Sequence, residues 1–173
     1  MIDPWLRIPA SDYEAHMALP EVAQAQVLSN LLTSVLIEYT PISLEVIGCT
    51  TGNGFEHINT ERTRRVVGID INPDYLKILK TRFDDRIPRL ELIKSDITAS
   101  DFWIDPVSMV FAGLVFEYVD VLCALGSIFR CLAANGIFLA VLQPFFQAGH
   151  LDPRLRIPGG MIVDDPRPLV EEF

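Results

Sequence analysis

A glycine-rich turn is the first stretch of the sequence whose residue types could bind a ligand. Residues 48–54 read GCTTGNG, with glycines at Gly48, Gly52 and Gly54, directly after an apolar run that predicts a strand. Glycine has no Cβ, so its backbone can adopt positive φ and approach a ligand closely. A helix predicted near 53–61 would direct free backbone N–H groups to the same place, which favours an anionic group. The glycine turn therefore indicates a site for a nucleotide-like cofactor, although an ordinary strand–helix turn would look similar.

Two aspartates stand at the ends of later apolar runs, as Gly48 does at the end of the first. Asp70 lies about 20 residues beyond Gly48, the separation at which an acid accepts the ribose hydroxyls of a bound nucleotide. Asp96 ends the following run, and its carboxylate could accept the exocyclic amine of adenine while Ile97 packs on the ring. Each aspartate could instead cap a turn or a helix, but Asn72 already occupies the capping position after Asp70.

The order of the glycines separates two classes of nucleotide cofactor. The dinucleotide fingerprint is G-x-G-x-x-G, and the three glycines here are spaced differently. No Tyr-x-x-x-Lys pair is present, so an NAD-dependent oxidoreductase is the less favoured alternative. The cysteines Cys49, Cys123 and Cys131 show no metal-site spacing, and we expect no metal.

The elements that would position these residues alternate along the chain. Strands alternating with helices predict an α/β fold, in which a parallel sheet with right-handed crossovers is covered on both faces. In such a sheet, with strand order 3-2-1-4-5, the glycine turn and both aspartates lie at the carboxyl edge, where ligands bind. The predicted strands are 43–48, 65–70, 90–93, 107–112 and 137–142, and the predicted helices begin at Pro20, near Asn53, at Asn72 and at Asp120, the last reaching Ala134.

The overall composition restricts the partners of the chain. The sequence has 173 residues, a net charge of −9 and 50% hydrophobic residues. The negative charge argues against nucleic acid, because Lys and Arg contacts to phosphates drive that binding. The longest charge-free stretch is interrupted by polar residues, so we expect no membrane span. The lack of an apolar leader and the few unpatterned cysteines favour a reduced, cytoplasmic setting.

The chain length predicts a single domain, 1–173. Residues 1–19 are irregular and aromatic, and we interpret them as a lid segment. Residues 20–143 would form the cofactor-binding core, and residues 144–173 form a proline-rich tail without a convincing strand.

Five segments in order, GCTTGNG, VVGIDINPDYL, KSDITASDF, VFAGLVFEYVD and LAANGIFLAVLQ, resemble the successive motifs of class I S-adenosylmethionine-dependent methyltransferases. The leading IPASDYEAHM is similar to the entry segment of a group of small bacterial members, and the resemblance covers about residues 8–142. It implies a Rossmann-like, doubly wound, mainly parallel sheet, S-adenosylmethionine as cofactor and a small-molecule methyl acceptor. A module that binds the cofactor without turnover is the alternative.

The resemblance also implies roles for individual residues. The family needs no dedicated catalytic residue, because alignment of the acceptor with the activated methyl group supplies most of the acceleration. His16 and Tyr118 are the candidates for a general base. The implied cofactor-binding residues are Gly48, Cys49, Thr50, Gly52, Gly54, Asp70, Ile71, Asp96, Ile97 and Ala112, with Tyr13 and Met17 of the lid segment folding over the cofactor.

The sequence departs from the family at the end of the first strand. The family usually has an acid two residues before the first glycine, where this chain has Val46, and Glu45 stands one residue too early. A one-residue offset in a strand directs the side chain to the opposite face. We therefore expect Glu45 to point away from the cofactor, unless a bulge restores the register.

A second departure concerns the carboxyl-terminal part of the sheet. The family closes its sheet with an antiparallel hairpin, which this sequence lacks. The fifth strand, 137–142, would then be an apolar edge, and such edges invite pairing with another chain. We expect either a homodimer through this edge, or a fragment of a longer chain, or coverage of the edge by the tail.

Overall fold

The computed structural model describes residues 4–142. Five strands form one sheet in the order β3-β2-β1-β4-β5, and each neighbouring pair runs parallel. Both the strand order and the parallel direction confirm the prediction from the sequence. The strands are β1 (Ser43–Ile47), β2 (Arg65–Asp70), β3 (Leu90–Lys94), β4 (Val107–Gly113) and β5 (Leu132–Val141).

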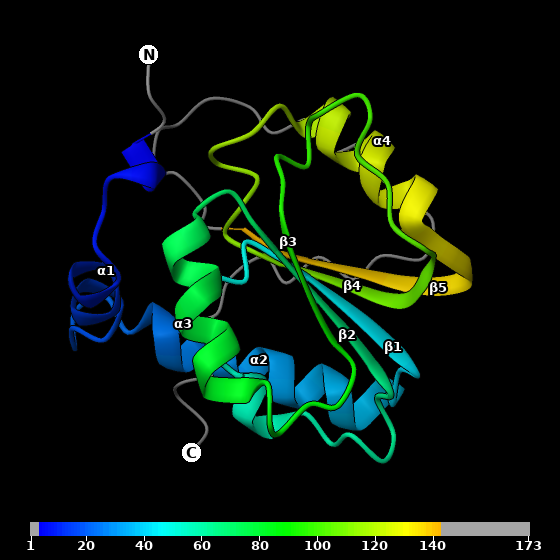
Figure 1. Cartoon of the computed structure of the whole chain (residues 1–173), viewed down its shortest axis with the longest axis horizontal. Coiled ribbons are helices and arrows are strands. Elements are labelled where there is room, and N and C mark those ends of the chain that lie inside the picture. Colours follow the sequence, from blue (N-terminus) through cyan, green and yellow to red (C-terminus); the bar gives the residue numbers. More distant parts are fainter. Residues whose placement is uncertain (1–3, 143–173) are drawn as a thin grey trace.

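Helices cover both faces of the sheet. Figure 1 shows α4 above the sheet and α2 and α3 below it, with α1 at the left of the view, next to α2. This is the doubly wound arrangement expected for a Rossmann-like sheet. The helices are η1 (Pro4–Leu6), α1 (Ala10–Met17), α2 (Gln24–Tyr39), η2 (Phe55–His57), α3 (Pro73–Phe83) and α4 (Val121–Cys131).

Alternation along the strands divides the core into two layers. In β1, Leu44 and Val46 belong to the layer that contains α2 and α3. Ile47 belongs to the other layer, which contains Ile128 of α4 and Val110 of β4. Because successive side chains in a strand point to opposite faces, each layer needs its own apolar residues. This requirement explains why the central strands are apolar at nearly every position.

Two helix starts follow the sequence signals. The side chain of Asn72 accepts hydrogen bonds from the backbone N–H groups of Asp74 (2.9 Å) and Tyr75 (3.4 Å), and Pro73 occupies the first helical position. Asp120 accepts a 2.8 Å hydrogen bond from the backbone N–H of Cys123 and caps α4. The predicted caps at both positions are confirmed.

The predicted helix near 53–61 is wrong. Only the three residues of η2 are helical there. Gly52 and Gly54 both adopt positive φ, +92° and +85°, which interrupts a helix before it can propagate. The Asn59 side chain then accepts a 2.9 Å hydrogen bond from the backbone N–H of Glu61, and such local bonds favour a turn over a helix.

Four further features differ from the prediction: the end of α4, the start of β5, the conformation of the lid segment and the start of α2. The helix from Asp120 ends at Cys131 rather than Ala134, because the chain enters β5 at Leu132, opposite Val107. The left-handed residue Asn135 (φ 60°) lies in the irregular start of β5, where the pairing with β4 shifts.

The lid segment is helical over α1 rather than irregular. The helix expected from Pro20 begins at Gln24, after Ala23 at φ 49°.

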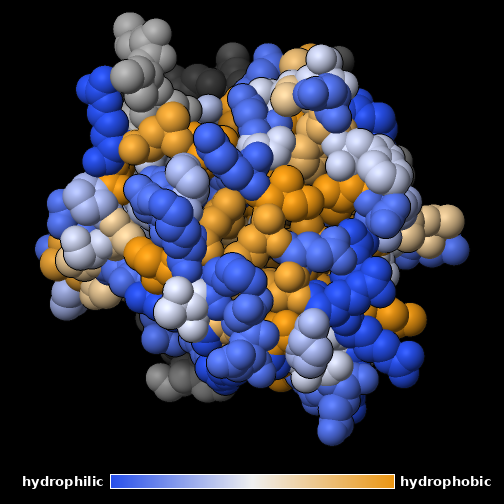
Figure 2. Space-filling view, in the orientation of Figure 1, coloured by the Kyte–Doolittle hydropathy of each residue, from blue (hydrophilic) through white to orange (hydrophobic). Residues whose placement is uncertain are grey.

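The two outer strands of the sheet are β3 and β5. Figure 2 shows hydrophobic surface in the middle of one face, around β3, framed by hydrophilic residues. β5 pairs only with β4 among residues 4–142. The tail and any closing hairpin lie outside the described residues, so the homodimer through this edge stays a prediction.

Within the described part, no helix is both long enough and apolar enough to cross a membrane.

Candidate functional site

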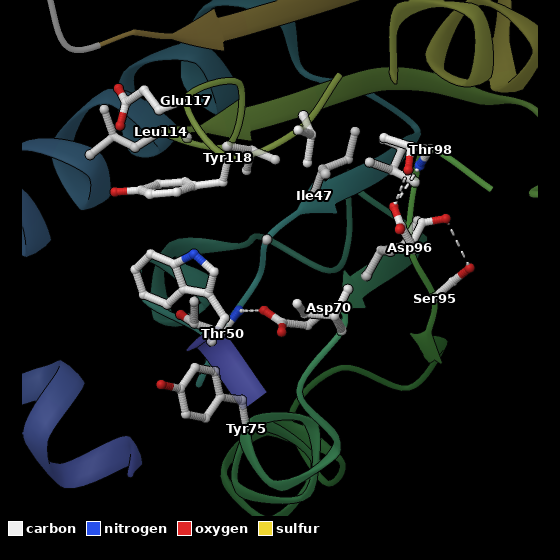
Figure 3. Close-up of a pocket in the computed structure, with 18 of the residues that line it drawn as sticks. Ile47, Thr50, Asp70, Tyr75, Ser95, Asp96, Thr98, Leu114, Glu117 and Tyr118 are labelled. Atoms are coloured by element: carbon white, nitrogen blue, oxygen red, sulfur yellow. Dashed lines mark hydrogen bonds between the residues drawn. The ribbon is translucent and has the colours of Figure 1, made fainter. Parts of the chain in front are cut away.

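A cavity of about 290 Å³ lies at the carboxyl edge of the sheet. The ends of β1, β2 and β4 and the turn after β3 form its floor, and the lid segment forms part of its opposite wall. Figure 3 shows Ile47 in the centre of the floor, with Asp70 and Asp96 from the ends of the next two strands and Leu114 and Tyr118 from beyond β4. The site therefore lies where an open parallel sheet is expected to bind ligands.

The glycine turn brings its backbone to the cavity. Gly48 adopts φ +65°, and a Cβ added there would lie only 2.7 Å from Cγ2 of Val115. Thr50 also has a positive φ, 47°, and lines the cavity. Cys49 between them is buried, and its sulfur lies against Gly68 in the layer of α2 and α3. Gly48 is thus required both for the backbone conformation and for the close approach.

Asp70 is the buried carboxylate of the site. Its Oδ2 accepts a 2.9 Å hydrogen bond from the backbone N–H of Thr50, and its Oδ1 accepts a 2.8 Å bond from the backbone N–H of Asn72. Each carboxylate oxygen can accept a second hydrogen bond, and the residue lines the cavity. Burial raises the pKa of Asp70, and the backbone N–H groups of Asn72, Thr50 and Ile71 oppose that shift. Asp70 can therefore accept donors from a ligand while it fixes the glycine turn.

Asp96 also lines the cavity but is partly committed to its own turn. Its Oδ1 accepts hydrogen bonds from the backbone N–H of Thr98 (2.8 Å) and from the Thr98 hydroxyl (2.7 Å). This is the turn role that the sequence left open as an alternative. Ile97 is buried and presents an apolar surface to the cavity. An aromatic ring held there could pack on Ile97 with a polar group near Asp96.

The lid segment is attached to the first turn of α3. The Asn72 amide donates a 2.9 Å hydrogen bond to the backbone carbonyl of Trp5, and the Tyr75 hydroxyl donates a 2.9 Å bond to the carbonyl of Ile8. The rings of Tyr13 and Tyr75 lie 5.6 Å apart. These contacts seat Tyr13 and Met17 beside the cavity, which both of them line.

A charged latch holds the other end of α1. Arg82 of α3 donates hydrogen bonds of 2.6 Å and 3.2 Å to the two carboxylate oxygens of Glu14, and the Thr51 hydroxyl donates to the same carboxylate. These hydrogen bonds from Arg82, with that from Thr51, lower the pKa of Glu14. The latch thus connects the lid segment, the glycine turn and α3 at one point.

Replacing Arg82 with Gln is expected to open the lid segment. The Arg82 and Glu14 side chains are 46% and 39% exposed, so the pair contributes about 0.2–1 kcal/mol. We expect up to about fivefold faster proteolytic cleavage near Asp12, from mass action on the open state. Lys77→Gln is the matched control, because it removes another exposed ion pair of α3, with Asp74, away from the lid. Equal cleavage rates in the two variants would count against the latch.

The structure distributes the residues predicted from the sequence between the cavity and its surroundings. Those that line the cavity are Gly48, Thr50, Asp70, Ile71, Asp96, Ile97, Tyr13, Met17 and Tyr118. Gly52 borders a neighbouring cavity, beside Glu14 and Arg82. Four predicted residues do not line the main cavity. Two of them, Cys49 and Ala112, are buried in the two core layers. The described lining also lacks Gly54 and His16.

Sequence reasoning missed several lining residues, among them Trp5, Tyr75, Leu114, Glu117 and Asp120. Trp5 is the most informative of them, because its ring lies 4.8 Å from the Tyr118 ring at an angle of 81°. The two residues are far apart in the sequence. The only local sign that Trp5 contacts the rest of the fold was its aromatic side chain in residues 1–19, a segment too short to have a core of its own.

Glu45 lies outside the cavity, in the layer of α4. Pairing of β1 with β2 is continuous from Ser43 to Ile47, so no bulge restores the register. The Glu45 side chain is fully buried, and neither carboxylate oxygen has a hydrogen-bond partner among the described residues. Burial raises the pKa of Glu45 to about 7, although the charge of Arg65 opposes the shift.

No group of three or more His, Cys, Asp or Glu residues with metal-binding geometry occurs within residues 4–142. The cavity combines a backbone turn, a buried carboxylate and an apolar floor.

Comparisons with known proteins agree with this geometry. The sequence matches the family described as "Methyltransferase domain" over residues 45–140. A search of curated proteins gave no match. Among solved structures, Streptomyces venezuelae DesVI is 21% identical with a TM-score of 0.59, and the alignment covers 83% of this chain and 61% of that one.

Two further structures show the same fold. A S-adenosylmethionine-dependent methyltransferase from Clostridium acetobutylicum is 14% identical with a TM-score of 0.60, covering 74% of this chain and 55% of that one. Coclaurine N-methyltransferase bound to N-methylheliamine and SAH is 15% identical with a TM-score of 0.54, covering 64% of this chain and 34% of that one. The chain therefore spans less than two thirds of the length of each of the three structures.

Proposed function

The chain belongs to the methyltransferase-domain family, and from this premise we propose that it transfers a methyl group from S-adenosylmethionine to a small-molecule acceptor. The observation that carries the proposal is Asp70, a buried carboxylate at the end of β2 whose oxygens face a cavity beside a glycine turn. A ribose offers two adjacent hydroxyl donors, and a carboxylate at this position is suited to accept both.

The other lining residues fit the remaining parts of that cofactor. Ile97 and Asp96 would hold the adenine, because they offer an apolar surface and a carboxylate side by side. Gly48 and Thr50 would approach the methionine part with their backbone. Bound there, S-adenosylmethionine would supply a methyl group already activated by its sulfonium. Coclaurine N-methyltransferase, which shares the fold, was crystallised with SAH, the product of such a transfer.

The protein's own contribution would be to orient the reactants and to exclude water. Tyr13 and Met17 of the lid segment lie over the cavity, and the latch at Glu14 and Arg82 keeps them there. Holding an acceptor in line with an activated methyl group can lower a barrier by about 7–11 kcal/mol. A dedicated catalytic base is therefore not required. Of the two candidates, Tyr118 lines the cavity and His16 does not.

Ligand titration tests the proposal directly. S-adenosylhomocysteine (SAH) at about 100 times its dissociation constant should stabilise the folded protein by about 2.7 kcal/mol, because it binds only the folded state. NAD at the same concentration should leave the melting temperature unchanged. A melting shift with NAD and none with SAH would overturn the assignment.

Turnover separates an enzyme from a binding module. We expect the protein to release SAH from S-adenosylmethionine when pooled small-molecule acceptors are added, above the rate without acceptors. Tight SAH binding without such release would favour the non-catalytic alternative.

A further inference from the structure

We propose that the cavity selects a protonatable amine as its methyl acceptor. The inference rests on the proposed methyl transfer and names the acceptor class for that same site. It follows from the charges that line the cavity, from the aromatic rings at its mouth and from the charge balance of the reaction.

The charged side chains that line the cavity are all acidic. They are Asp70, Asp96, Glu117 and Asp120, and no Lys, Arg or His from residues 4–142 joins them. A concave site lined by one sign of charge concentrates ligands of the opposite sign and repels those of the same sign. An acceptor with a carboxylate or a phosphate would enter without a cationic partner, whereas an ammonium group would be attracted.

The acids fall into two groups on opposite sides of the cavity. Figure 3 shows Asp96 on one side of Ile47, and Glu117 and Tyr118 on the other, in the loop between β4 and α4. Asp70 and Asp96 are the acids assigned to the cofactor. Glu117 and Asp120 have no such role and lie where an acceptor would approach. The hydrogen bond from the backbone of Cys123 lowers the pKa of Asp120, which keeps this carboxylate negative.

Aromatic rings stand on the same side as Glu117. The rings of Trp5 and Tyr118 meet edge to face at 4.8 Å, and those of Trp5 and Tyr13 lie 6.2 Å apart at 78°. Tyr118 is 59% exposed, which places it at the mouth of the cavity. Ring faces attract cations within about 6 Å of their centres. The lid segment thus adds an aromatic surface to an acidic one, a combination that suits an organic ammonium group.

Once the amine has lost its proton, the methyl transfer itself keeps the charge of the cavity constant. The ammonium first releases a proton to water, which exposes the nitrogen lone pair. That lone pair forms the new N–C bond while the C–S bond of the cofactor breaks and leaves its electron pair on sulfur. The positive charge therefore moves from sulfur to nitrogen, and the methylated product is a cation. Acidic side chains near both atoms stabilise the charge before and after the transfer.

Matched probes test the acceptor class. Two sets share one skeleton each: 2-phenylethylamine, 2-phenylethanol and 3-phenylpropionate, and tryptamine, tryptophol and indole-3-propionate. Binding of each is measured by calorimetry to the full chain saturated with SAH. We expect each amine to bind at least about tenfold more tightly than its alcohol and its carboxylate, with a preference that decreases as salt rises.

A pair of variants locates the preference. Glu117→Gln should weaken amine binding by about twofold to fivefold and leave alcohol binding unchanged, since a partly exposed charge contributes modestly. Glu61→Gln is the matched control, because Glu61 is an exposed acid outside the cavity, and it should change neither.

The outcomes keep the two proposals distinct. Failure of SAH to bind would overturn the proposed function. Normal SAH binding, with alcohols or carboxylates bound as tightly as the amines or with no amine bound, would overturn the amine inference alone. A preference for amines that is undiminished in Glu117→Gln would also overturn it, because the acidic wall would then not be its source.

Discussion

Asp70→Asn is expected to weaken the binding of SAH by roughly 10- to 100-fold. The carboxylate accepts backbone N–H groups from Thr50 and Asn72 and still faces the cavity. An amide at this position offers one acceptor oxygen in place of two, and its NH₂ group would face a backbone donor or a ribose hydroxyl. Leaving buried polar groups unpaired costs about 1–3 kcal/mol, which corresponds to this loss of affinity. Calorimetric titration with SAH measures it.

A matched variant separates the effect of Asp70 on SAH binding from its effect on the stability of the fold. Asp74→Asn removes an acid from the same region, but Asp74 is 77% exposed and pairs with Lys77 at the surface of α3. We expect its affinity for SAH to match that of the wild type. Thermal unfolding of both variants without ligand shows how much Asp70 contributes to holding the glycine turn. Unchanged SAH affinity in Asp70→Asn would remove Asp70 from the binding site.

The second large effect concerns the pH dependence of stability. Glu45 is fully buried without a hydrogen-bond partner among the described residues, and burial raises its pKa to about 7. In the unfolded chain a glutamate has a pKa of about 4.3. The native state therefore binds more protons, and the free energy of unfolding falls as pH rises from about 4.5 through 7. By pH 8 the loss should be on the order of 3 kcal/mol.

Neighbouring groups explain why the Glu45 carboxylate has no hydrogen-bond partner within residues 4–142. Arg65 lies on the same face of the sheet, but its guanidinium donates to both carboxylate oxygens of Glu91, at 2.9 Å and 2.8 Å, and to the backbone carbonyl of Asp105. Its hydrogen-bonding capacity is thus directed away from Glu45. An isolated buried carboxylate is costly when charged, so the protonated form is the stable one at acidic pH.

Glu45→Gln tests this account, because the amide has almost the same shape and no charge. At pH 5 the two proteins should differ by less than about 1 kcal/mol in the free energy of unfolding, since both carry a neutral buried group. At pH 8 the variant should be more stable by up to about 3 kcal/mol. Urea unfolding at several pH values between 5 and 8 measures the difference. A difference that does not change with pH would show that Glu45 does not titrate in this range.

The position of Glu45 also bears on how the cofactor's ammonium group would be held. The family's usual acid position is occupied by Val46, which is buried in the layer of α2 and α3. Glu45 points to the other layer and cannot replace it. The acids that line the cavity belong to β2, the turn after β3 and the loop after β4. Weak SAH binding in the wild type would therefore be consistent with the missing acid.

The sequence by itself determined the sheet and the edge at which ligands meet it. The apolar runs predicted all five strands, and β2 was predicted with its observed bounds. Asn72 and Asp120 marked two helix starts because capping depends on neighbouring residues alone. Strand alternation likewise predicted that Glu45 points away from the carboxyl-edge cavity, whose lining does not include it. These features depend on local patterns and on general rules of parallel sheets, so one sequence suffices to predict them.

Only the tertiary structure decided the features that depend on contacts between distant residues. The lid segment forms α1 because Glu14 meets Arg82 and Tyr75 meets Ile8 across the fold. The helix after β4 ends early because Leu132 pairs with Val107. Trp5 reaches Tyr118, and Arg65 turns to Glu91 instead of Glu45, through side-chain packing in three dimensions. No local pattern specifies such pairs, because their energies arise only when separate elements have come together.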